Sequence, residues 1–132
     1  MVEFALVAIL LFLLVFGIAE FGRAWFHADV LKGYANTLAR TYAVKGATAG
    51  EELKDKVIDE ALKKRNMTIE IDFTCNDASG NFRDCDEDVA PLPESVTATV
   101  KELQFKVVAG LLTIKKLSNI TITRTATYRL EK

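Results

Sequence analysis

The chain has 132 residues, a length within the usual range of a single domain. Its 17 lysines and arginines almost balance its 18 aspartates and glutamates, so the net charge is −1. This balance gives no overall basic surface for nucleic acid, and we expect no nucleic-acid partner.

An uninterrupted apolar run stands near the N-terminus. Between Glu3 and Glu20 the chain reads FALVAILLFLLVFGIA, without a charged or hydrogen-bonding side chain. The run falls just short of the roughly 20 residues that cross a bilayer, and a helix that is apolar on all sides needs burial on all sides. We therefore predict that residues 1–23 form an apolar helix that lies in a membrane or among other apolar helices.

A cleavable signal peptide is the alternative for this run. Such a peptide has a basic leader before its apolar residues and a small-residue cleavage site after them. Met1 and Val2 supply no basic leader, and the run passes directly into Phe21, Gly22 and Arg23. We therefore expect the apolar helix to be retained in the working protein.

The helical pattern continues beyond the run and becomes one-sided. Apolar residues recur at intervals of three or four, at Trp25, Ala28, Leu31, Ala35, Leu38, Ala39, Tyr42 and Ala43. Because no proline interrupts residues 1–45, we predict one long helix with an apolar first half and an amphipathic second half. Gly46 is its expected C-terminal cap.

A second, shorter helix is predicted next. The sequence from Thr48 to Glu51 has the spacing of a capping box, which marks a helix start. An apolar stripe follows at Leu53, Val57, Ile58, Ala61 and Leu62. Residues 63–65 are basic, as suits a helix C-terminus.

From Met67 the apolar period changes to two, which predicts half-buried strands. In the first strand the inward residues are Ile69, Ile71, Phe73 and Cys75. In the second strand they are Val96, Ala98 and Val100, after which the apolar residues shift to Leu103, Phe105 and Val107. This shift predicts a bulge near Lys101 and Glu102.

The last predicted strand has Ile120, Ile122, Ala126, Tyr128 and Leu130 on one face. The elements together predict an α+β fold. It consists of the long N-terminal helix, a second short helix and a small antiparallel sheet of three to four strands.

Cys75 and Cys85 are the only cysteines. If the apolar helix holds the rest of the chain outside the cytoplasm, a disulfide is favoured over a metal pair, because no nearby histidine or further cysteine completes a zinc set. Two unrelated thiols are the alternative. The acidic residues between 77 and 88 supply enough oxygens for calcium in principle, but they lack the full spacing of an EF-hand. We therefore favour a solvated acidic loop and expect no metal and no cofactor.

Residues suited to catalysis are few. His27 is the only histidine, and the sequence aligns no serine or cysteine with it. Phosphate loops, dinucleotide fingerprints and metalloprotease motifs are missing from the sequence. We therefore expect that the chain is not an enzyme. Asn66 and Asn119 fit the glycosylation sequon and are candidate modification sites.

The opening residues carry a resemblance to a known family. Val2 to Val7, the apolar run, and Phe16 to Arg23 together resemble the N-terminal signature of TadE-like pilus proteins, in the wider type IV pilin and pseudopilin group. The tail, at residues 96–100, 111–112 and 120–129, resembles their closing strands. The resemblance implies a precursor cut by a prepilin peptidase, insertion into the inner membrane, and assembly by an ATP-driven machine into a secreted filament.

On this basis residues 1–23 are the expected membrane and filament-core helix, and residues 24–132 the pilin-like head, which includes the second half of the long helix. Residues expected to pack in the filament core are Phe4, Leu6, Val7, Leu10, Leu11, Leu14, Phe16 and Phe21. Gly17 and Gly22 either allow close helix packing or mark a local unwinding of the helix.

Glu3 is the residue expected to set the register of assembly. A carboxylate in apolar surroundings needs a partner, and the free N-terminal amine of a neighbouring subunit is the nearest available cation. A simple position at the membrane–water boundary is the alternative for Glu3.

The leading hypothesis for function is a structural subunit of an extracellular type IV-like pilus, with an inner-membrane precursor pool and other copies of the chain as its main partners. One alternative is a minor pseudopilin that primes or caps assembly. Another is a membrane-anchored domain that binds a ligand outside the cell. Sheared fibres made mainly of this chain would favour the first hypothesis, and detergent-soluble monomers the last.

Overall fold

A computed structural model describes residues 2–76, 82–85, 94–105 and 120–130. The helices are α1 (Val2–Lys45) and α2 (Ala47–Arg65), and the strands are β1 (Ile69–Asn76), β2 (Phe82–Asp84), β3 (Ser95–Phe105) and β4 (Ile120–Arg129). The strands form one antiparallel sheet in the order β2-β1-β3-β4. The predicted α+β fold is confirmed.

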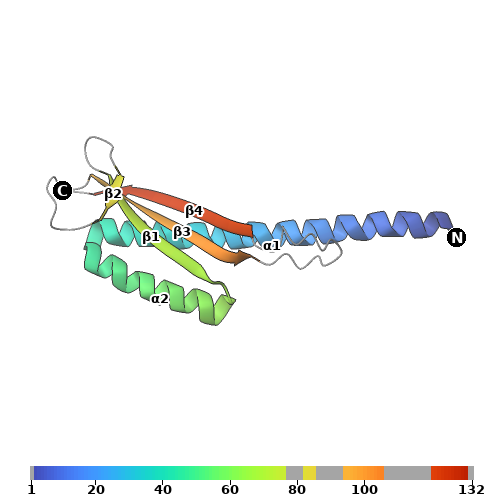
Figure 1. Ribbon diagram of the computed structural model, residues 1–132, viewed down its shortest axis with the longest axis horizontal. Helices are drawn as coiled ribbons and strands as arrows, with labels where there is room; N and C mark the ends of the chain where they lie inside the picture. The colour runs from blue at the N-terminus through green and yellow to red at the C-terminus, as the bar shows by residue number, and fades with distance from the viewer. Residues whose placement is uncertain (1, 77–81, 86–93, 106–119, 131–132) are drawn as a thin grey trace.

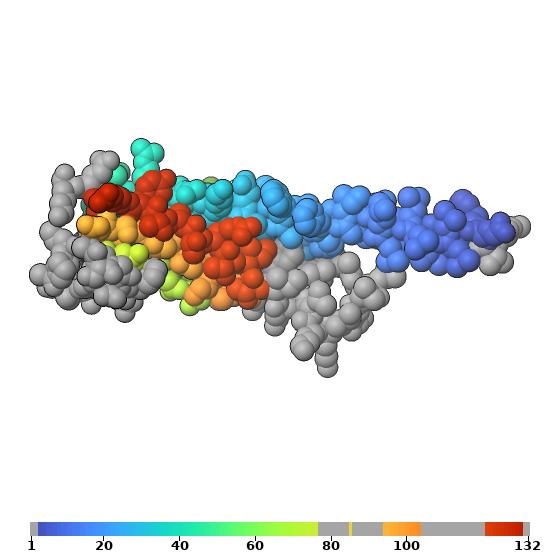
Figure 2. All heavy atoms as spheres, turned by 90° about the horizontal axis from the view of Figure 1, so that it is seen from above, coloured from blue at the N-terminus to red at the C-terminus, as the bar shows by residue number. Residues whose placement is uncertain are grey.

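The long helix α1 is unbroken over 44 residues, as its lack of proline predicts. At a rise of 1.5 Å per residue it is about 66 Å long. The strands and α2 lie along its second half, whereas its first half projects away from them (Figure 1). A view from a second direction shows the same projection (Figure 2).

A single residue, Gly46, joins the two helices. Its φ of 89° lies in the region that favours glycine, and its N–H donates a hydrogen bond to the carbonyl of Tyr42 at 3.0 Å. The predicted capping box is wrong, because α2 begins at Ala47 and has no side-chain cap, so Thr48 already lies inside the helix. At the other end of α2, Asn66 adopts the left-handed conformation that terminates a helix.

The core lies between the sheet, the second half of α1 and one face of α2. Buried apolar side chains of the helices are Ala28, Leu31, Ala35, Leu38, Ala39, Tyr42, Val57 and Ala61. Those of the strands and the α2–β1 link are Met67, Ile69, Ile71, Phe73, Cys75, Val96, Ala98, Val100 and Ala126. The inward residues predicted for β1 are therefore confirmed, and the small residues of α1 let its backbone approach the sheet closely.

One predicted inward position in each of α1, α2 and β4 is exposed instead. Trp25, Leu62 and Tyr128 fit the apolar periods of their elements, but the structure leaves them 67, 52 and 37% exposed. Each lies towards one end of its apolar stripe, where no further element of the described chain covers it. The side chains of Phe105 and Ile120, and the whole of Val107, lie outside the described residues.

The irregularity predicted in β3 is present but lies slightly later. The pairing of β3 with β4 shifts register between Glu102 and Phe105, not at Lys101 and Glu102. The inward alternation continues past Val100 to Glu102, which is buried, whereas Leu103 is exposed. The predicted inward position of Leu103 is therefore wrong, and a carboxylate occupies the inward position beside it.

The outer face of the sheet carries paired charges. Lys101 of β3 donates a hydrogen bond to the Asp72 carboxylate of β1 at 2.9 Å. This hydrogen bond, reinforced by the negative charge of Asp72, raises the pKa of Lys101 above its ordinary value. Cross-strand pairs of opposite charge at the surface stabilise a sheet by only a few tenths of a kcal/mol, so they mainly favour the correct register.

Cys75 and Cys85 form a disulfide, as predicted, with their Cα atoms 5.1 Å apart. Cys75 belongs to the buried face of β1, and Cys85 directly follows β2. The hydroxyl of Tyr42 donates a hydrogen bond to the Cys85 carbonyl at 3.2 Å. The bridge and this hydrogen bond fix the end of the sheet to the last turn of α1.

Gly50 of α2 lies in close contact with Tyr42 of α1. A Cβ atom at this buried position would meet Cδ2 of Tyr42 at 2.6 Å. The Tyr42 ring cannot easily retreat, since it packs on Phe73 with a centroid distance of 4.9 Å and its hydroxyl is bonded to Cys85. The absence of a side chain at Gly50 thus sets how closely α2 approaches α1.

We expect Gly50→Ala to lower the free energy of unfolding by about 1 to 3 kcal/mol, because the added methyl group overpacks the helix contact. Gly33→Ala is the matched control, since Gly33 lies in α1 with nothing within 4 Å of an added Cβ. This control should be neutral or more stable by up to about 1 kcal/mol, the helix propensity of alanine over glycine. Thermal and denaturant unfolding of the full chain in detergent measures both, and equal effects would contradict the contact.

Candidate assembly surface

The candidate functional surface is the projecting first half of α1. We call residues 2–23 the stem, and the described residues from 24 onward the head. The apolar side chains of the stem are exposed on all sides of the helix, from Phe4 at 79% to Leu13 at 46%. Exposed residues include every one predicted to pack in a filament core: Phe4, Leu6, Val7, Leu10, Leu11, Leu14, Phe16 and Phe21.

A helix with this surface is not stable in water alone. A monomeric soluble protein rarely exposes a contiguous apolar patch beyond a few hundred Å², and a helix that is apolar all round is normally covered all round. By length and composition alone, α1 is a candidate membrane span, a test that a signal sequence near the N-terminus also passes. The stem therefore requires lipid or other helices around it.

The junction of stem and head contains polar contacts. Arg23 and Glu20 form an ion pair one turn apart, with 3.2 Å between Nη2 and Oε2. Their side chains are 37 and 21% exposed, so the pair is partly shielded from water. The uninterrupted apolar stretch of α1 thus ends at a pair of charges that belong to the helix itself.

A buried histidine–carboxylate pair lies one turn further along α1. Nδ1 of His27 is 3.0 and 3.1 Å from the two carboxylate oxygens of Glu102 in β3. The Glu102 side chain is 3% exposed and that of His27 is 21% exposed. Because a carboxylate only accepts, His27 donates through Nδ1. This contact ties the base of the sheet to α1 at the end of the head nearest the stem.

Sequence reasoning missed this pair. Its signal was a glutamate in phase with the inward residues Val96, Ala98 and Val100, together with the only histidine of the chain on the facing helix. A buried carboxylate needs a hydrogen-bond donor, so Glu102 could have been matched with His27.

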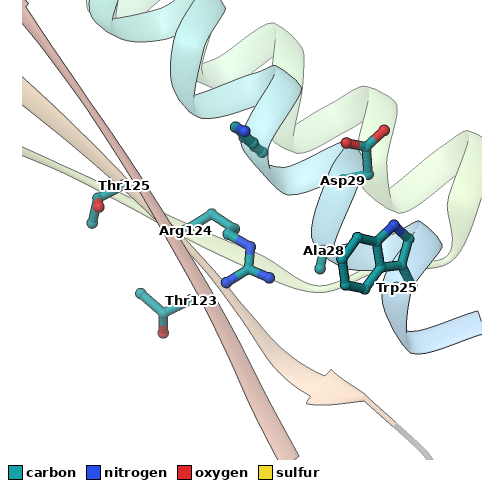
Figure 3. A pocket seen from close by; sticks show the side chains of 7 residues that line it. Trp25, Ala28, Asp29, Thr123, Arg124 and Thr125 are labelled. Carbon is teal, nitrogen blue, oxygen red and sulfur yellow. The ribbon is translucent and has the colours of Figure 1, made fainter. Parts of the chain in front are cut away.

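A groove opens between α1 and β4 just beyond the junction. It has a volume of about 540 Å³ and is lined by Trp25, Ala28, Asp29, Lys32, Thr123, Arg124 and Thr125. The Arg124 side chain reaches from β4 towards Ala28 and Trp25 of the helix (Figure 3). On another side of the junction, the Arg65 guanidinium of α2 stands 5.6 Å from the centre of the Phe26 ring.

The comparison with protein families concerns α1, against which these features lie. Residues 1–40 match the family of TadE-like proteins. The match covers the stem and most of the amphipathic second half of α1, and it confirms the resemblance predicted from the opening residues. A comparison with curated proteins finds no match, and neither does one with solved structures.

The match makes residues 1–40 similar to TadE-like proteins, which suggests a pilus-associated protein with an apolar N-terminal helix. Within this TadE-like segment, Glu3 lies in the first turn of α1 with its side chain exposed. Its carboxylate is therefore accessible to a neighbouring molecule. Whether it sets register stays a prediction, as does the division of stem and head at residue 23.

The two glycines of the TadE-like stem, Gly17 and Gly22, lie within the unbroken helix. An added Cβ at either position would have nothing within 4 Å. The single chain is therefore not unwound at these positions, and their small size leaves room for another helix to approach. Close packing and unwinding both stay predictions for the assembled state.

The remaining candidate sites are in the head. Asn66 is exposed at the C-terminal cap of α2, while Asn119 and most of the acidic segment at 77–88 lie outside the described residues. Within the described ranges, no three or more histidine, cysteine, aspartate or glutamate side chains gather closely enough to hold a metal ion.

Proposed function

We propose that the chain is a structural subunit of an extracellular type IV-like pilus filament, in which the stems of neighbouring copies pack together. The observation that carries this proposal is the exposure of apolar side chains on every side of the stem. The described head has its own core, whose buried apolar residues all lie at or after Ala28. The stem thus contributes nothing to that core, and its apolar surface is available for assembly.

Before assembly the stem lies in the inner membrane. A bilayer covers the same apolar surface that neighbouring stems cover in the filament, so transfer between the two environments costs little apolar exposure. The prepilin peptidase and the pilus assembly machinery are the partners implied by this route. The TadE-like match of the stem supports the route.

The role is non-enzymatic in this proposal. The only histidine, His27, has its ring engaged with the buried Glu102 carboxylate. This ring holds two elements of the head together, a structural use of the side chain. A minor subunit that primes or caps the filament would have the same stem and would differ in its abundance within the fibre.

Glu3 provides the sharpest test of the proposal. A subunit that enters the filament brings the first turn of its stem among apolar helices, where an unpaired carboxylate is costly. The amine at a neighbour's N-terminus would neutralise this charge and define the axial register. We expect Glu3→Ala to accumulate in the membrane and to yield few sheared fibres, with the head correctly folded.

The measurement compares membrane level and sheared-fibre yield for the parent and the variant, with electron microscopy of the fibres. The composition of the sheared material separates a major subunit from a minor one. Glu3→Gln is the matched control, since it keeps shape and hydrogen bonding without the charge. If Glu3→Gln restores the fibre yield and Glu3→Ala does not, Glu3 acts through a hydrogen bond and not through its charge. Full fibre yield from Glu3→Ala would show that Glu3 does not set the register.

A further inference from the structure

Three elements each place an arginine close to the section of α1 where the stem meets the head. Arg23 ends the stem, Arg65 of α2 stands over the Phe26 ring, and Arg124 of β4 lines the groove beside Trp25. Arg23, Trp25 and Phe26 lie within about 5 Å of helix rise on α1, and the groove that Arg124 lines continues from Trp25 to Lys32. We call the three arginine side chains the arginine collar.

Exposed aromatic rings occupy the same level. Phe21, Trp25 and Phe26 are 69, 67 and 56% exposed, and the Phe21 and Trp25 rings lie 6.1 Å apart. Tryptophan is enriched where a membrane meets water, because its ring is apolar and its N–H is a donor. This explains why the apolar period of α1 includes Trp25 although no described element of the head covers it.

The length of the stem places the collar at the headgroup layer. From Phe4 to Arg23 the helix rises by about 28 Å, which matches the roughly 30 Å thickness of the hydrocarbon core. A stem that spans the bilayer therefore puts Arg23 at the edge of the hydrocarbon. Trp25 and Phe26, with the arginines that contact them, then lie among the lipid headgroups.

The charge at this level favours an anionic partner. Apart from the His27–Glu102 pair, the section of α1 from Glu20 to Lys32 and the groove, with Arg65, carry four cations and two carboxylates: Arg23, Lys32, Arg65, Arg124, Glu20 and Asp29. Arginine binds phosphate oxygens through two parallel N–H donors, and basic side chains at a bilayer surface attract anionic lipids.

We propose that the arginine collar binds the headgroups of anionic phospholipids around the stem in the membrane-anchored form. The proposal rests on the membrane precursor described above and adds the lipid class that it selects. The collar holds the base of the head against the bilayer surface, so the head stands at a fixed height above the membrane before assembly.

Trp25 is the only tryptophan of the chain, so its fluorescence reports on this level directly. The full chain is reconstituted into vesicles of phosphatidylcholine and phosphatidylglycerol in which either one lipid or the other carries brominated acyl chains. Bromine quenches nearby tryptophan, so the ratio of the two quenching values measures which lipid surrounds Trp25. We expect brominated phosphatidylglycerol to be enriched about threefold over its bulk fraction at low salt.

The test variant is Arg65→Glu with Arg124→Glu, which should abolish the enrichment. The matched control is Arg40→Glu with Lys45→Glu, two exposed cations of α1 that change the net charge equally. Arg40 lies about 25 Å along the helix from Arg23, well beyond the roughly 10 Å screening length at moderate salt, so the control should keep the enrichment. Raised salt should weaken enrichment in the parent.

The outcomes separate this inference from the membrane anchor. Quenching in the parent that only follows the bulk fractions of the two lipids, or enrichment that survives in Arg65→Glu with Arg124→Glu, would overturn the collar and leave the anchor intact. A lack of quenching by either lipid in the parent would show that the stem does not enter the bilayer, which overturns the membrane precursor and the collar with it.

Discussion

A fragment that lacks residues 1–23 should be a water-soluble monomer with the fold of the head. The deletion removes the exposed apolar surface of the stem, whereas every buried apolar residue of the described chain lies at or after Ala28. The His27–Glu102 contact and the Cys75–Cys85 bridge both remain. Assembly into fibres should be lost completely, because the surface proposed to polymerise is gone.

Size-exclusion chromatography with light scattering gives the mass of this fragment, and circular dichroism gives its helix and strand content. The full chain in detergent is the reference for both. Trp25 and Phe26 stay exposed in the fragment, so weak self-association at high concentration is compatible with the prediction. Regular filaments formed by the fragment would remove the stem from its proposed role.

His27→Ala should lower the free energy of unfolding by about 3 to 5 kcal/mol, because it leaves the buried Glu102 carboxylate without the donor that faces it. Glu102 is 2% exposed in the folded chain, so its carboxylate relies on the His27 ring for a donor. Denaturant unfolding of the full chain in detergent, or of the soluble fragment, measures the effect. The stem should still insert into membranes.

The two partners of this pair should respond unequally. Glu102→Leu should cost less than His27→Ala, because the histidine that it leaves behind is 21% exposed and can reach water. Replacement of both residues by leucine should recover much of the stability, since no buried charge then remains. Equal and small effects of His27→Ala and Glu102→Leu would show that the contact contributes little.

The elements with a strong and regular apolar pattern could be predicted from the sequence. The absence of proline up to Lys45 predicted one long helix, and the alternation from Ile69 to Cys75 predicted a strand with one buried face. These patterns show which side of an element is apolar, and they can be read from neighbouring residues in the sequence alone. The stem could be predicted most clearly, because a single neighbouring element cannot cover a helix that is apolar on all sides.

The features that could not be predicted depend on which neighbouring element covers each position. Apolar periodicity includes Trp25 in the α1 stripe, but the buried part of that stripe starts at Ala28. Glu102 was missed because a charged residue is normally assigned outward, and its partner His27 lies 75 positions away in the chain. The start of α2 was misplaced because the φ of Gly46 allows a turn of one residue, which left no room for a separate cap.

The continuity of α1 also couples the length of the stem to the orientation of the head. Each residue of an α-helix turns the chain by about 100° and advances it by 1.5 Å. Because α1 runs unbroken from Val2 to Lys45 and the sheet is fixed to its second half, the number of residues before Ala28 determines the direction in which the head faces. Loss of one residue from the stem would turn the whole head by more than a quarter of a circle with hardly any change in height. In the proposed fibre, the direction in which each head faces would thus depend on the length of the apolar run as well as on its composition.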